Sequence, residues 1–295
     1  MKTANQATHD YGIIGKRKQK INSITRYLFL TVIAVVMLYP ILWLLGASFK
    51  SNSEIFSSIW FWPETFSLSA YIKGWETGTE YTFATYFMNT FKIVIPKVVF
   101  TVVSCTLTAY GFARFQFPFK RQLFALLIAT LFLPSVVTRI PLYLLWRNLG
   151  LLDTYVPLVA NTIFAQEAFF VFMLVQFLRS IPRAYDEAAT IDGCNSFQIL
   201  IRILLPILKP SLITVGLFQF MWSMNDFLGP LIYISSVEKY PVSIALKMAM
   251  DTTSGVTEWN QIIAMSLIAL LPSLILFFIA SKQFVDGMSS GGIKG

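Results

Sequence analysis

Residues that carry enzyme chemistry are scarce in this chain of 295 residues. It has one histidine, His9, and two cysteines, Cys105 and Cys194. Protein metal sites built from histidine and cysteine need a cluster of these ligands, and histidine-based catalytic triads need a histidine beside the nucleophile. The sequence therefore predicts no catalytic residue, no metal site and no disulfide framework, which disfavours an enzyme acting within the membrane.

A phosphate-binding loop is also missing. A P-loop needs GxxxxGK followed by Ser or Thr, because successive backbone N–H groups surround the phosphates while the lysine reaches the terminal oxygens. The nearest match is Gly12, Gly15 and Lys16, which has the wrong spacing and is followed by Arg17. We therefore expect that the chain binds no nucleotide and that its energy source lies elsewhere.

The link between Ser180 and Pro210, SIPRAYDEAATIDGCNSFQILIRILLPILKP, is punctuated like two short helices. Ser180 is predicted to cap a short helix with Pro182 in its first turn, and Gly193 is predicted to end that helix in a left-handed conformation. Asn195 or Ser196 is predicted to cap the next helix. The link therefore reads as two short helices with a sharp turn at Gly193.

The first of these short helices has a composition that suits contact with another protein. Ala188 and Ala189 are small, so another backbone can approach closely, and Glu187 and Asp192 offer acceptors at the flanks. These features describe a knob that fits a protein cleft. From spacing alone, a surface hairpin that only joins two larger elements is an equally good interpretation.

A second polar group comprises Gln219, Trp222, Asn225 and Asp226. Planar polar groups and aromatic faces bind sugars in partly desolvated cavities. Gln219, Trp222 and Asp226 stand at i, i+3 and i+7, so one helix face would carry all three. Hydrogen bonding and aromatic packing between helices is the alternative interpretation.

The elements that position these residues are membrane helices. The chain is 56% apolar and only 13% charged, and neither Tyr27 to Ala47 nor Trp259 to Ser281 contains an Asp, Glu, Lys or Arg. A helix needs about 20 mostly apolar residues to cross the hydrocarbon core. Four further spans are predicted, each with charged interruptions: roughly Tyr86 to Ala113, Gln122 to Trp146, Thr154 to Leu178 and Ile203 to Ile234.

Six spans place both termini on one side of the membrane, and the distribution of basic residues predicts which side. The side with the termini holds 15 of the 23 Lys and Arg residues, so it is expected to be cytoplasmic. The net charge of +8 is then a signal of topology and need not indicate nucleic acid. The loop from Phe49 to Glu80, which contains Trp60, Trp62 and Trp75, is expected on the opposite side.

Several motifs together resemble one family. The run Glu187, Ala188, Ala189, Asp192, Gly193, followed by Leu205 and Pro206, is similar to the EAA loop of binding-protein-dependent ABC importer permeases. AYGFARFQFP at 109–118, NDFLGPLIYI at 225–234, YPVSIAL at 240–246 and the ending FVDGMSSGGIKG extend the likeness over most of the chain. The combination resembles the carbohydrate-uptake class, in particular the maltose-permease-like second transmembrane subunit.

This resemblance implies an all-α polytopic fold with six transmembrane helices of the type I ABC importer kind, in a bacterial plasma membrane. It implies a cytoplasmic tail at 1–24, a permease domain at 25–284 and a cytoplasmic tail at 285–295. The segment 180–197, here named the coupling segment, would dock on an ATPase through Glu187, Ala188, Ala189, Asp192 and Gly193.

The resemblance also implies the partners. They are a second permease, two subunits that bind ATP and Mg²⁺, an extracellular sugar-binding protein and a di- or oligosaccharide, with no cofactor in this chain and no nucleic acid. A transporter driven by an ion gradient is the alternative, although the sequence shows no repeated halves and few buried carboxylates. The family often has a bulky aromatic residue where Gly229 stands, which would allow a wider cavity there.

Overall fold

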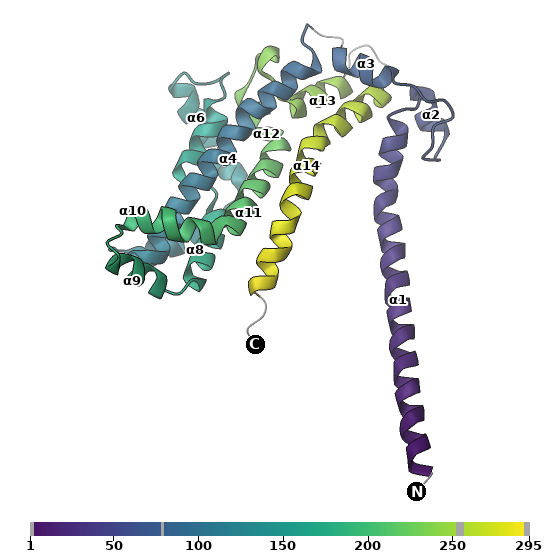
Figure 1. Ribbon diagram of the computed structural model, residues 1–295. Helices are drawn as coiled ribbons and strands as arrows, with labels where there is room; N and C mark the ends of the chain where they lie inside the picture. The colour runs from purple at the N-terminus through teal and green to yellow at the C-terminus, as the bar shows by residue number, and fades with distance from the viewer. Residues whose placement is uncertain (1–2, 78–79, 252–256, 292–295) are drawn as a thin grey trace. The chain divides into compact units, whose positions relative to one another are not determined.

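The structure, a computed structural model, describes residues 3–77, 80–251 and 257–291. These residues form helices joined by turns and include no strand (Figure 1). They divide into two compact units, Met1–Ile72 with Glu258–Leu267, and Lys73–Thr257 with Ile268–Gly295. Helix α14, Trp259–Gly291, begins in the first unit and continues in the second.

The first unit contains the long helix α1, Thr3–Ala47, and the short helix α2, Asn52–Ser57. The predicted tail at 1–24 is therefore helical from Thr3, and its boundary at residue 24 is not a helix boundary. Between Thr3 and Tyr39 the sequence has no proline that would end the helix. Residues 1–2, like residues 292–295 of the predicted C-terminal tail, lie outside the described residues.

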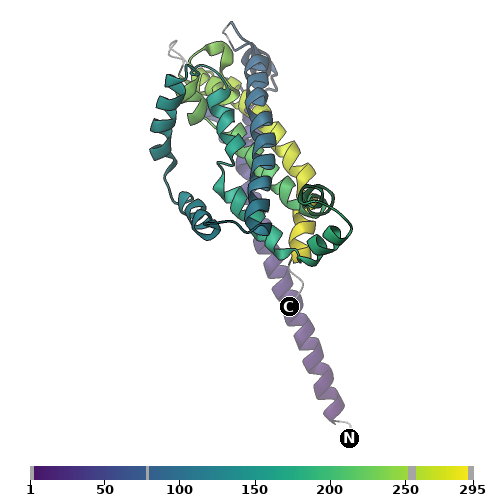
Figure 2. The same cartoon turned by 90° about the vertical axis from the view of Figure 1, so that its left-hand side faces the viewer.

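Three helices form the centre of the second unit. α4, Phe83–Arg114, packs against both α8, Ala168–Ser180, and α11, Leu205–Met224, and α8 also contacts α11 (Figures 1 and 2). Within the described residues, five helical segments are long and apolar enough to cross a membrane: Thr25–Ala47, Phe83–Arg114, Val156–Ser180, Ser196–Met224 and Trp259–Ser281. They correspond to five of the six predicted spans.

The remaining predicted span, Gln122 to Trp146, is wrong as a single helix. It is formed by two helices, α5, Lys120–Thr130, and α6, Ser135–Asn148, which Figure 2 shows as separate elements. Pro134 cannot donate a hydrogen bond, and in a continuous helix its ring would clash with the carbonyl group of Thr130. The helix therefore ends before this proline and restarts at Ser135.

Two other spans contain interruptions. The fourth consists of α7, Val156–Val159, the 3₁₀ turn Ala160–Phe164 and α8. The fifth begins earlier than predicted, with α10, Ser196–Ile199, and passes through a π-helical turn, Leu200–Leu204, into α11. Pro206 explains this turn, because widening the helix moves the carbonyl group of Arg202 away from the proline ring.

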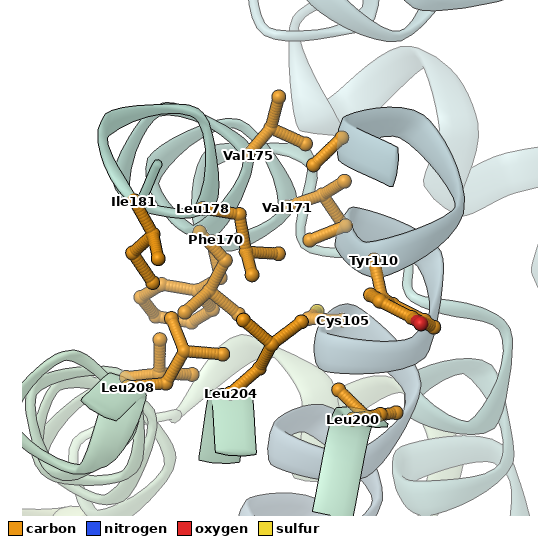
Figure 3. Packing of buried hydrophobic residues seen from close by; sticks show 14 of the residues in the cluster. Cys105, Tyr110, Phe170, Val171, Val175, Leu178, Ile181, Leu200, Leu204 and Leu208 are labelled. Carbon is orange, nitrogen blue, oxygen red and sulfur yellow. The ribbon is translucent and has the colours of Figure 1, made fainter. Parts of the chain in front are cut away.

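A buried apolar cluster joins the central helices (Figure 3). α4 contributes Cys105 and Ala109, α8 contributes Phe170 and Leu174, and the π-helical turn contributes Leu204. Each of these five side chains is fully buried. Because lipid tails are as apolar as these side chains, close packing is the main source of attraction where the cluster lies within the membrane.

Short elements stand at the two ends of α4 (Figure 1). Its last residues lie beside α9, Ala184–Ile191, and α10. Its first turns lie beside the 3₁₀ turn Val237–Lys239 and α13, Val242–Met250. Two further short helices are α3, Ser69–Glu76, and α12, Leu228–Tyr233.

Candidate coupling site

Helix α9 ends as the sequence predicts. Gly193 has a φ of +82°, its N–H donates to the carbonyl of Thr190 at 3.0 Å, and the N–H of Cys194 donates to the carbonyl of Ala189 at 2.9 Å. These two bonds form a Schellman motif, which satisfies carbonyl groups that a helix end leaves free. Glycine adopts this left-handed conformation without steric cost, so the predicted stop at Gly193 is confirmed.

Of the two helix N-caps predicted in the coupling segment, one is confirmed and the other is wrong. Asn195 caps α10 in a full capping box: its side chain accepts from the N–H of Gln198, whose side chain accepts from the N–H of Asn195, both at 2.9 Å. The prediction that Ser180 caps α9 is wrong. Ser180 still belongs to α8, where its hydroxyl donates to the carbonyl of Phe177 at 2.7 Å, and α9 begins only after Arg183.

The predicted contact residues lie on two faces of α9. Glu187, Ala188, Asp192 and Gly193 are exposed, but Ala189 is 2% exposed and belongs to the buried apolar cluster. The small size of Ala189 therefore lets α9 approach its own bundle. Of the two alanines, only Ala188 offers a surface to a partner.

Polar contacts attach the coupling segment to α4. The Nε atom of Arg114 lies 2.9 Å from a carboxylate oxygen of Asp186, and its Nη2 atom donates to the carbonyl of Ile181 at 3.1 Å. The hydroxyl of Tyr110 donates to the carbonyl of Ser196 at 2.9 Å. Burial raises the pKa of Asp186, and the positive charges of Arg114 and Arg183 oppose that change.

A cavity of about 400 Å³ opens beside this ion pair. Its wall combines apolar, hydroxyl and charged side chains from α4, α9 and α10: Tyr110, Arg114, Phe115, Arg183, Asp186, Glu187, Thr190, Ile191, Ser196 and Ile199. Ile191 is 86% exposed even though it lies outside the membrane-crossing segments. Ile191 therefore adds one exposed apolar side chain to the otherwise mixed wall of this cavity.

The four predicted cavity residues do not share one helix face. α11 ends at Met224, so Asp226 does not stand at i+7 of the same helix as Gln219. Gln219 is 2% exposed, and its amide donates to the hydroxyl of Ser223 at 3.0 Å. Asn225 is exposed, and its amide donates back to the carbonyl of Met221 at 2.8 Å.

The other two residues are held by neighbours. Trp222 stacks on Phe170 with ring centroids 4.9 Å apart and is still 47% exposed. Asp226 pairs with Lys97 of α4 at 3.3 Å and accepts a bond from the N–H of Gly229 at 3.0 Å. Of the four predicted residues, Trp222 and Asn225 therefore present the most free surface, while Gln219 is part of the packing.

Gly229 does not widen a cavity. It is buried, and a Cβ atom added there would stand 2.6 Å from a carboxylate oxygen of Asp226. The carboxylate therefore occupies the space that the absence of a side chain provides.

Comparison with known proteins decides the family. A family model described as "Binding-protein-dependent transport system inner membrane component" matches residues 101–289. The chain belongs to this family. It is a permease component and a multi-pass membrane protein.

Relatives agree over nearly the full length. The chain is 30% identical over 280 residues to the probable ABC transporter permease protein YurM of Bacillus subtilis (strain 168), covering 95% of this chain and 91% of YurM. It is 29% identical over 271 residues to the arabinooligosaccharides transport system permease protein AraQ of the same organism, covering 91% and 94%.

A solved structure shares the fold. A chain from the crystal structure of a bacterial ABC transporter involved in the import of the acidic polysaccharide alginate matches with a TM-score of 0.78 and 24% identity, covering 90% of this chain and 97% of that chain. This likeness confirms the predicted all-α polytopic architecture.

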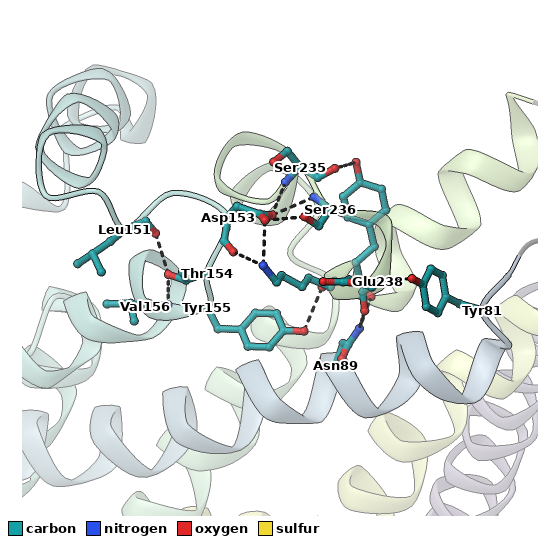
Figure 4. A network of polar contacts seen from close by, with 12 residues as sticks. Tyr81, Asn89, Leu151, Asp153, Thr154, Tyr155, Val156, Ser235, Ser236 and Glu238 are labelled. Carbon is teal, nitrogen blue, oxygen red and sulfur yellow. Dashed lines mark hydrogen bonds and ion pairs between the residues drawn. The ribbon is translucent and has the colours of Figure 1, made fainter.

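A polar network of this permease is centred on Asp153, which the sequence did not mark as a functional residue (Figure 4). Asp153 accepts from the N–H groups of Ser235 and Ser236 at 3.0 and 2.9 Å, from the Ser236 hydroxyl, and from Lys239 at 2.9 Å. The Asn89 amide donates to the carbonyl groups of Glu238 and Tyr240 at 2.7 and 3.2 Å. Together these contacts fix the loop 234–241. No motif marked Asp153, since its partners lie about 80 residues later.

Proposed function

We propose that this permease is the transmembrane subunit of an ATP-driven, binding-protein-dependent importer of di- or oligosaccharides. The family match and the names of relatives such as AraQ support the sugar class. Named relatives also include a diacetylchitobiose uptake system permease protein of Streptomyces coelicolor and a galactooligosaccharides transport system permease protein of Bacillus subtilis.

The coupling segment is proposed to be the surface on which an ATP-hydrolysing partner docks. The observation that carries this proposal is the exposed α9 knob, with Glu187 and Ala188 facing outward and Ile191 86% exposed beside a cavity of about 400 Å³. An isolated apolar residue on a polar surface needs no partner, but Tyr185 and Phe197 are also exposed on the same hairpin.

This arrangement assigns no covalent chemistry to the permease. ATP and Mg²⁺ would be bound by two ATPase subunits, and a similar second permease would complete the membrane path. ATP-dependent closure of the ATPases would shift the equilibrium between inward-open and outward-open states through α9. The excess of basic residues supports a cytoplasmic coupling segment and cytoplasmic termini, so the loop 234–241 would face the sugar-binding protein.

Direct contact with sugar is proposed for Trp222 and Asn225. Trp222 is 47% exposed as a residue even though its ring stacks on Phe170, and Asn225 is exposed. Aromatic faces and amides are groups that bind sugars. Asp226 would contribute mainly through its ion pair with Lys97.

The decisive experiment perturbs the coupling segment and leaves the membrane helices intact. Glu187→Lys should prevent the ATPase subunits from copurifying with the permease and should abolish sugar uptake by the reconstituted complex. Asp251→Lys is the control, because Asp251 is exposed at the end of α13, away from α9. Normal assembly and uptake with Glu187→Lys would contradict the proposed docking surface.

A further inference from the structure

Helix α4 makes polar contacts at both of its ends, with elements that lie on opposite sides of the membrane in the proposed topology. At its last residue, Arg114 contacts Asp186 and Ile181. In its second turn, Asn89 bonds two carbonyl groups of the loop 234–241, and the Thr90 hydroxyl accepts from the N–H of Val242 at 2.9 Å. The helix between Asn89 and Arg114 is about 37 Å long, more than the roughly 30 Å hydrocarbon core.

We propose that Arg114 is the positioning residue that makes α9 move together with α4, so that a displacement of the coupling segment reaches the loop 234–241 through one continuous helix. The role of α9 in coupling rests on the proposed function. The attachment of α9 to α4 through Arg114 does not, because both partners belong to this chain.

The covalent chain alone does not fix the orientation of α9. Only Ile181, Pro182 and Arg183 separate it from α8, and Ile181 is extended, with φ −80° and ψ +123°. Arg114 restricts that freedom in addition to the packing of Ala189, because it contacts both this linker and α9: its Nη2 atom donates to the Ile181 carbonyl, and its Nε atom forms an ion pair with the Asp186 carboxylate that lacks hydrogen-bond geometry. One guanidinium group thus links the linker and α9 to α4 through one directional bond and one ion pair.

The ion pair is better suited to fixing geometry than to adding stability. The Arg114 side chain is 8% exposed and that of Asp186 is 20% exposed, so both charges lose much of their hydration. Desolvation offsets much of the attraction in such pairs, and apolar residues often replace them without loss of stability. Removing one partner is costly, because the other charge is then left buried without compensation.

The cavity beside the pair leaves room for α9 to tilt if the pair is broken. Arg114, Asp186 and Ile191 all line it, so no side chain of the described residues fills the space next to the contact. The hydroxyl of Tyr110 secures α10 rather than α9. Arg114 is therefore the polar contact that, beside the packing of Ala189, holds the orientation of α9.

The test measures a distance within the full permease in its complex with the ATPase partner. Spin labels are placed at Ala184→Cys on α9 and Leu107→Cys on α4, which are both exposed and outside the proposed docking surface, after Cys105→Ala and Cys194→Ser. With Arg114 intact, the distribution of label distances should be narrow and unchanged by ATP. With Arg114→Gln, the population of displaced α9 should rise about tenfold, the change in an equilibrium constant given by about 1.4 kcal/mol.

Two further variants make the outcome decisive. Asp186→Asn removes the charge pair but keeps the bond to Ile181, so it should broaden the distribution less than Arg114→Gln. The double variant Arg114→Met with Asp186→Leu should keep the thermal midpoint but give a broad distribution. Asp251→Asn, which removes one carboxylate from the exposed Lys247–Asp251 pair, is the control.

The result that overturns the proposal is a narrow distribution in the double variant or in Arg114→Gln, because the pair would then only fill space. Copurification of the ATPase is recorded for each variant. If Glu187→Lys still assembles while Arg114→Gln broadens the distribution, the docking surface is wrong but the role of Arg114 in holding α9 stands. If Glu187→Lys fails to assemble while Arg114→Gln leaves the distribution narrow, the docking surface stands and the proposed role of Arg114 is wrong.

Discussion

Replacement of Asp153 by asparagine should loosen the loop 234–241 and leave the helix bundle folded. The carboxylate accepts four hydrogen bonds from three residues, Ser235, Ser236 and Lys239. An asparagine side chain at this position would keep one acceptor oxygen, but its NH₂ group would face neighbouring groups that are themselves hydrogen-bond donors. The negative charge that strengthens these bonds would also be lost.

The magnitude follows from the groups that are left without a partner. Hydrogen bonds to charged groups contribute about 1.5–3 kcal/mol each, but exposed ion pairs contribute less than about 1 kcal/mol. Lys239 is 36% exposed, so most of the effect comes from Ser235 and Ser236. We expect a local loss of about 2 kcal/mol, or roughly a 30-fold rise in the population of the open loop.

Hydrogen exchange measures this opening directly. The amides of Ser235 and Ser236 should exchange about 30-fold faster in Asp153→Asn, whereas amides in α4 and α8 should be unaffected. Asp251→Asn is the matched control, because its pair with Lys247 is exposed, with 62% of the Asp251 side chain accessible. Unchanged exchange at Ser235 and Ser236 would show that Asp153 does not hold the loop.

The pH dependence provides an independent check. The hydroxyl of Ser236, followed by Lys239 and the two amides, lowers the pKa of Asp153 below its ordinary value of 3.8, although burial opposes the change. The folded pKa is depressed, so the stabilisation is fully present above pH 3.8 and is lost as the pH falls through the folded pKa. Protection of Ser235 and Ser236 should therefore decline only in strong acid, and Asp153→Asn should abolish that dependence.

Three other substitutions test separate parts of the permease. Gly193→Val should lower the thermal midpoint and impair ATPase copurification, because a side chain at φ +82° costs about 1–2 kcal/mol, whereas Gly193→Asn should be milder; equal effects would contradict the backbone explanation. Gly229→Ala should destabilise by about 1–2 kcal/mol in thermal unfolding by displacing the Asp226 carboxylate, and an unchanged midpoint would refute this clash. Trp222→Ala should reduce sugar uptake with assembly intact; normal uptake with a lower midpoint would indicate that its stacking on Phe170 is only structural.

The sequence predicted those features of the fold that depend on local composition. Tyr27 to Ala47 and Trp259 to Ser281 are charge-free, and both lie within described helices. Hydropathy could not show where Gln122 to Trp146 breaks, because its residues are apolar on both sides of Pro134. The break depends on whether neighbouring groups satisfy the freed backbone, and composition does not contain that information.

In the coupling segment too, features set by neighbouring residues in the sequence were predicted, and contacts between distant residues were not. Gly193 and Asn195 were predicted because caps depend on residues within one turn of each other. Ser180 was misassigned because its hydroxyl can bond either forward or back into α8, and sequence does not distinguish the two. The contact of Arg114 with Asp186 joins distant parts of the chain, so AYGFARFQFP gave no indication of it.

The surroundings of Asp226 illustrate why the effect of the glycine at position 229 is hard to predict from sequence alone. The Asp226 carboxylate lies just beyond the end of α11 and has two partners, Lys97 and the N–H of Gly229. The hydroxyl of Ser243 also donates to the backbone carbonyl of Asp226 at 2.9 Å, which gives this carbonyl a partner beyond the end of α11. With a side chain at position 229, the carboxylate could not reach the Gly229 N–H in this geometry. Gly229 is therefore better explained as a requirement of the Asp226 carboxylate than as an enlargement of the transport path.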